Sequence, residues 1–71
     1  MIDQSEINTR FTYHKPHGNQ PEKYEQLRNK AKELASLYLD LVPESREQSL
    51  AITALEESVM WANAGVARRE P

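Results

Sequence analysis

The chain has 71 residues, of which 38% are hydrophobic; it has no cysteine, and its formal net charge is −2 at pH 7. This length predicts one domain with a small core, and the lack of cysteine excludes disulfides and thiolate metal sites. The nearly balanced charge argues against DNA binding, which needs a basic surface. No apolar run is long enough to cross a membrane and no signal peptide is recognisable, so we expect a soluble protein with no membrane partner.

A short helix is predicted from about residue 4 to residue 10. Asp3 is a suitable N-cap with Glu6 three residues later, and Ile2 and Ile7 occupy the two positions of a hydrophobic staple. A helix of this length is unstable alone in water, so we expect it to dock on another element.

The segment 11–20 is predicted to be a connector, because its proline and glycine prevent a continuous helix. It carries Phe11, Tyr13 and both histidines of the chain, and loops on a helical scaffold often carry binding groups. His14 and His17 are spaced as a possible metal pair. With no third ligand evident, we expect exposed histidines and neither a metal nor a cofactor.

Two longer helices are predicted for residues 20–41 and 45–69. The first ends before Pro43, and the second opens with a capping box in which Ser45 and Gln48 satisfy helix-end N–H groups reciprocally. The connection between the two helices is short, and short connections make antiparallel neighbours. The two helices are therefore predicted to form an antiparallel hairpin.

The last helix has an unusually broad apolar face. Its apolar and small residues cover an arc of about 200°, whereas a surface helix needs an apolar stripe of only about 100°. The second helix can cover about half of this arc, and the first helix is too short to cover the remainder. Five small residues with heptad-like spacing mark the uncovered part: Ala51, Ala54, Ser58, Ala62 and Gly65.

Small side chains let helix axes approach closely, so this stripe is predicted to meet either its own symmetry mate or the hairpin partner. Homo-oligomerisation follows from either arrangement. The sequence thus predicts a single all-α domain over residues 1–71, with a short N-terminal helix and an antiparallel two-helix hairpin, assembled as a compact homo-oligomer.

No arrangement of catalytic residues is evident, and we predict that the protein is not an enzyme. Glu56 and Glu57 point about 100° apart on their helix, which favours a solvated face over a shared acid–base site. Trp61 is interpreted as a core or interface anchor, because a base-stacking role requires its ring to border a groove.

Basic residues in the first half of the chain surround Tyr13 and His14. A solvated face with i,i+4 ion pairs is the simpler interpretation, and the alternative is a site in which cations hold phosphate while an aromatic ring stacks on a base. Arg68 and Arg69 have a simple structural interpretation, because cations suit the C-terminal end of a helix dipole. The basic residues of the first half are Arg10, Lys15, Lys23, Arg28, Lys30 and Lys32.

Three segments resemble the small bacteriophage anti-CBASS proteins that sequester cyclic oligonucleotides: residues 10–14 (RFTYH), 43–51 (PESREQSLA) and 55–64 (LEESVMWANA). CBASS is a bacterial immune system that signals infection with cyclic di- and trinucleotides. The resemblance covers almost the whole chain. It implies helical hairpins that assemble as homohexamers in the cytoplasm of the infected bacterial host and bind the messenger without cleaving it.

The resemblance also implies site residues. Tyr13 matches a tyrosine of the family's cyclic-dinucleotide site, and Arg28 or Lys30 matches its basic residue on the second helix. Arg68 or Arg69 matches the arginine of a separate cyclic-trinucleotide site formed where three protomers meet. A two-helix hairpin has no interior of the roughly 300–1,000 Å³ that ligand pockets have, which favours sites between subunits.

The expected function is therefore sequestration of cyclic di- and trinucleotide messengers, which keeps them from activating the CBASS effector. The expected partners are these nucleotides and further copies of the chain. The alternative is an oligomeric helical adaptor that binds a protein partner on its remaining apolar arc.

Overall fold

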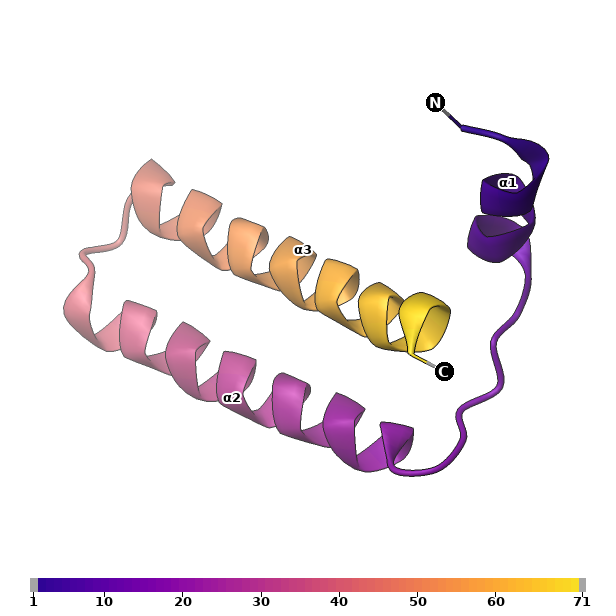
Figure 1. Ribbon diagram of the computed structural model, residues 1–71. Coiled ribbons are helices and arrows are strands. Elements are labelled where there is room, and N and C mark those ends of the chain that lie inside the picture. Colours follow the sequence, from indigo (N-terminus) through magenta and orange to yellow (C-terminus); the bar gives the residue numbers. More distant parts are fainter. Residues whose placement is uncertain (1, 71) are drawn as a thin grey trace.

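The computed structural model describes residues 2–70, within which three α-helices and no strands occur (Figure 1). The helices are α1 (Gln4–Phe11), α2 (Gln20–Leu41) and α3 (Arg46–Arg69). The long helices α2 and α3 lie side by side and antiparallel, and α1 lies beyond the open end of this hairpin. The predicted all-α hairpin fold is confirmed.

Side-chain caps start two of the three helices. Asp3 Oδ1 accepts a hydrogen bond from the Glu6 backbone N–H at 2.9 Å, and Ser45 Oγ accepts one from the Gln48 N–H at 3.1 Å. The Gln48 side-chain amide donates to the Val42 carbonyl at 2.9 Å, so it holds the loop before Ser45 rather than completing the predicted reciprocal box. α2 begins after Gly18, whose φ of 56° allows the turn into the helix.

The chain folds as a flat layer. Its principal extents are 45 × 30 × 14 Å, and the smallest of these is little more than the roughly 10–12 Å diameter of one helix. The radius of gyration is 15.4 Å, against about 11 Å for a compact domain of this length. No apolar side chain among residues 2–70 is fully buried. The chain by itself therefore lacks the second layer that normally closes a hydrophobic core.

The accessible surface area of the chain is larger than that of a compact monomer. The accessible surface is 5870 Å² for a chain of 8.2 kDa, whereas a folded monomer of this mass exposes about 4,500 Å². The excess of about 1,300 Å² exceeds the roughly 800 Å² that one partner contributes to an interface of standard size.

The packing between α2 and α3 decides which part of the broad apolar arc stays uncovered. Four members of the small-residue stripe, Ala54, Ser58, Ala62 and Gly65, are exposed, so α2 does not cover it. Of the two arrangements that the sequence left open, packing of the stripe on the hairpin partner is therefore excluded. An open hollow is lined by five half-buried residues of α2 and α3: Ala31, Ala35, Ile52, Leu55 and Val59.

A buried glutamine closes the open end of the hairpin. Gln20 is 2% exposed; its Nε2 donates to the Val66 carbonyl and to Glu70 Oε1, and its Oε1 accepts from the His17 N–H, each at 3.2 Å. Lys23 forms an ion pair with Glu70 beside it. These contacts join the start of α2 to the end of α3, and we did not predict them from the sequence.

Replacing Gln20 with alanine is expected to lower the free energy of unfolding by about 1–3 kcal/mol, because the Val66 carbonyl and the His17 N–H lose a buried partner. Urea unfolding followed by circular dichroism, at one fixed protein concentration, measures the change. Gln26, an exposed residue of α2, provides the control: Gln26→Ala should stay within about 0.5 kcal/mol of the wild type. Equal unfolding midpoints for both variants would contradict a stabilising role of Gln20.

Candidate functional site

An open hollow lies where the connector passes the ends of α2 and α3, and we call it the connector hollow. Its volume is about 540 Å³. It brings together Tyr13, Arg28 and Arg68, which come from the connector, α2 and α3. The lining residues are Arg10, Thr12, Tyr13, His14, Tyr24, Arg28, Asn63, Ala64, Ala67 and Arg68.

A hydrogen bond of the neighbouring residue, His14, anchors the segment that carries Tyr13. The ring Nε2–H of His14 donates to the Thr9 carbonyl at 2.7 Å, which ties the connector to the last turn of α1. His14 is consequently half-buried rather than exposed as expected, whereas His17 is exposed. Tyr13, the next residue, is 82% exposed. Its phenol face is therefore available for stacking on a planar ring.

The two basic residues considered on α2 differ in position. Arg28 lines the connector hollow and forms an ion pair with Glu25 at 2.6 Å. Lys30 pairs with Glu33 at 3.4 Å and is not among the described residues that line this hollow. Two residues along a helix turn the side chain by about 200°, so Arg28 and Lys30 point to nearly opposite sides of α2.

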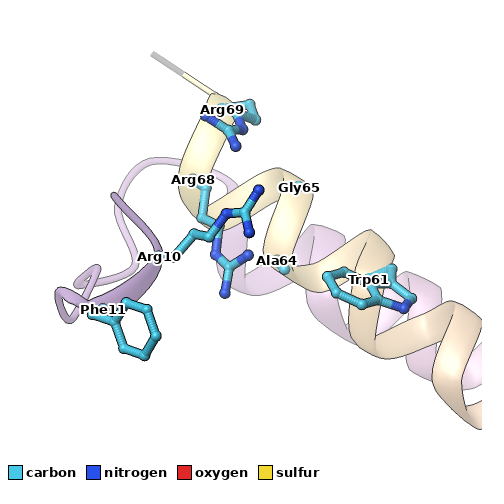
Figure 2. A pocket seen from close by; sticks show the side chains of 7 residues that line it. All are labelled: Arg10, Phe11, Trp61, Ala64, Gly65, Arg68 and Arg69. Carbon is cyan, nitrogen blue, oxygen red and sulfur yellow. The ribbon is translucent and has the colours of Figure 1, made fainter. Parts of the chain in front are cut away.

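A second hollow, the α1–α3 cleft, lies beside the first and has a volume of about 410 Å³. Figure 2 shows the guanidinium groups of Arg10, Arg68 and Arg69 gathered near the C-terminal end of α3, with Phe11 on one side and Trp61 farther along the helix. Phe11 is 85% exposed and Trp61 is 65% exposed. The cleft thus combines cations with aromatic faces.

The position of Trp61 corrects part of its interpretation. Trp61 is not a core residue of the single chain, and its ring borders a groove, as a stacking role requires. Its indole Nε1–H donates to Glu57 Oε1 at 3.3 Å, one turn earlier on α3. This bond orients the indole along the helix surface.

The carboxylate of Glu6 binds two of the three arginines of the cleft. Glu6 Oε2 accepts hydrogen bonds from Arg69 and from Arg10 Nε, each at 2.7 Å. Hydrogen bonding to Arg69 and then to Arg10 lowers the pKa of Glu6 from its ordinary 4.5 to about 2, and the same contact raises the pKa of Arg69. Glu6 is therefore ionised at neutral pH. Within residues 2–70, Arg68 forms no ion pair.

The sequence did not reveal the role of Glu6, because its partner Arg69 is 63 residues away. The sequence also gave no sign that Asn63 belongs to the candidate site. Its Oδ1 is buried without a hydrogen-bond partner among residues 2–70, and the residue lines the connector hollow.

The all-α hairpin thus carries two adjoining hollows, each lined by arginine and aromatic side chains. The family model of the Acb2/Tad1 hairpin domain matches residues 3–67. The chain belongs to the Acb2/Tad1 family, known as anti-CBASS cyclic-nucleotide sponge proteins, which confirms the resemblance seen in the sequence. No curated protein and no solved structure matches the chain. None of the helices in the described part is long and apolar enough to cross a bilayer.

Proposed function

We propose that this chain captures cyclic dinucleotides and cyclic trinucleotides without cleaving them and so keeps them from CBASS effectors in the infected cell. The observation that carries the proposal is the connector hollow, where Tyr13 stands beside Arg28 and Arg68. Base–aromatic stacking contributes about 1–3 kcal/mol per base, and arginine binds phosphate through strong charge-assisted hydrogen bonds. Capture of this kind requires affinity and abundance, but no catalytic group.

In the dinucleotide site, Tyr13 stacks on a base and Arg28 holds a phosphate. Lys30 points away from Tyr13 in the same protomer, so its contribution would have to come from a neighbouring copy. Arg68 and Arg69 hold phosphates of a cyclic trinucleotide. Because Arg10 and Arg68 each line both hollows, the two ligand classes would adjoin at these residues.

The working form in this proposal is a homo-oligomer, with six copies expected from the family resemblance. The excess surface of about 1,300 Å² supports it, as does the exposed small-residue stripe of α3. Both hollows are open on the protomer, and a neighbouring copy would supply the remaining walls. Walls that are held in place before binding reduce the ordering cost of capture.

The exposed apolar surface is the observation that favours the second candidate, an adaptor that binds a protein partner. One experiment separates the two functions. The protein is incubated with a cyclic dinucleotide or trinucleotide, freed of unbound ligand and denatured, and the supernatant is chromatographed. We expect intact ligand at a stoichiometry set by the assembly. Absence of both ligands would favour the adaptor, and a linear product would indicate a phosphodiesterase.

A further inference from the structure

The ion pair between Glu6 and Arg69 joins α1 to the hairpin. Both Arg69, from α3, and Arg10, from α1, donate to the same carboxylate oxygen, Oε2 of Glu6. The side chain of Glu6 is 23% exposed, while those of Arg10 and Arg69 are 43% and 58% exposed. A carboxylate oxygen therefore occupies the position where the two guanidinium groups of the α1–α3 cleft converge.

Two guanidinium groups that converge on one oxygen would offer the same donors to a phosphate oxygen. We infer that Glu6 is an internal substitute for a ligand phosphate, which an incoming anion must displace before it can bind Arg10 and Arg69. Glu6 thereby determines which anions the cleft accepts. This inference rests on the proposed function of the cleft as a site for cyclic trinucleotides.

The charges around the cleft favour a cyclic trinucleotide over a cyclic dinucleotide. Arg10, Arg68 and Arg69 bring three positive charges to the cleft, and Glu6, which is not itself a lining residue, pairs with Arg10 and Arg69. Arg68 forms no ion pair within residues 2–70, so a first phosphodiester meets an available cation. Every further phosphodiester competes with Glu6 for Arg10 or Arg69. A ring with three phosphodiesters and three bases has more contacts with which to displace Glu6 than a ring with two.

Displacing Glu6 also breaks the ion pair that joins α1 to α3. This helix has eight residues, too few to be stable alone, and Glu6 supplies its ion pair to α3. A phosphate held by both Arg10 of α1 and Arg69 of α3 would take the place of that connection.

Replacing the Glu6 carboxylate with a neutral amide changes the trinucleotide affinity in opposite directions under the two possible roles of Glu6. If Glu6 competes with the ligand, Glu6→Gln strengthens cyclic-trinucleotide binding. If Glu6 has only the structural role of keeping Arg10 and α1 in place, the same change weakens cyclic-trinucleotide binding. For a competitor that holds the arginines about 90% of the time, the gain is about tenfold.

The experiment measures the affinity of the full chain for a cyclic tri-adenylate by calorimetry. Glu6→Gln should bind about tenfold more tightly. The gain for a cyclic di-adenylate should be smaller, because only Arg10 of the two arginines that Glu6 holds also lines the connector hollow. Glu44→Gln, at the far end of the hairpin, removes the same charge and should have no effect. Glu6→Asp, which keeps the charge on a shorter side chain, is the second variant if Glu6→Gln does not fold.

A carbon-13 titration of the Glu6 carboxyl in the wild type gives a second measurement. Bound trinucleotide should raise the pKa of Glu6 from about 2 toward its ordinary 4.5, because both arginines then bind phosphate. Unchanged or weaker trinucleotide binding by Glu6→Gln would overturn the inference alone, provided that removing Arg68 and Arg69 abolishes wild-type binding. If neither the wild type nor Glu6→Gln binds the trinucleotide, the proposed function of the cleft fails as well.

Discussion

Replacing Tyr13 with alanine is expected to weaken cyclic-dinucleotide binding by roughly 5- to 150-fold, the range that corresponds to losing one base–aromatic stacking contact. The oligomer should persist, because Tyr13 is 82% exposed in the connector and is not a member of the small-residue stripe of α3. Calorimetry measures the affinity, and light scattering on the same samples measures the mass of the assembly.

Two variants make this experiment specific. Tyr13→Phe keeps the ring and should retain most of the affinity, which separates stacking from hydrogen bonding by the hydroxyl. Phe11→Ala removes an equally exposed aromatic ring that lines the α1–α3 cleft and is not among the residues of the connector hollow. It should leave dinucleotide binding unchanged. Wild-type affinity in Tyr13→Ala would eliminate the connector hollow as the dinucleotide site.

Replacing Ala62 with arginine is expected to dissociate the assembly toward single chains of 8.2 kDa. Ala62 lies in the middle of the exposed small-residue stripe, where a long charged side chain would keep helices apart and lose its hydration. Sedimentation velocity at micromolar concentration measures the change, and loss of ligand capture should accompany it if the hollows are completed by neighbouring copies.

Asn29→Arg is the matched control, because Asn29 is exposed on α2 and lines a surface hollow with Pro21, Glu22, Glu25 and Gln26. Its assembly should keep the wild-type mass. A wild-type protein that sediments as a stable, folded monomer would contradict both this prediction and the shared-site part of the proposed function.

The helices themselves follow from signals within a few residues of each boundary. Asp3 caps the N–H of Glu6, and Ser45 caps that of Gln48, each over three residues. The sequence also predicted the turn at Pro43, because proline stops a helix within one turn. It missed the part that Gln48 plays in the loop, since the choice between the Ser45 N–H and the Val42 carbonyl depends on how the loop folds.

The candidate site, unlike the helix boundaries, depends on residues that are far apart in the sequence. Tyr13 and Arg28 were selected by resemblance to a family, and their common hollow depends on the path of the connector past α2. Periodicity indicated an apolar arc too broad for one partner helix. It could not indicate which half α2 would cover, because several rotations of α3 bury similar area.

By itself the sequence determined that this protein is an all-α hairpin with a short leading helix and too much apolar surface for its own length, because caps, breakers and helical periodicity act over a few residues. Only the tertiary structure decided that the small-residue stripe faces outward, that Gln20 closes the hairpin against Val66, and that Glu6 holds Arg69. Those contacts join residues 46 and 63 positions apart, and their partners are chosen by the direction in which packed helices present their side chains.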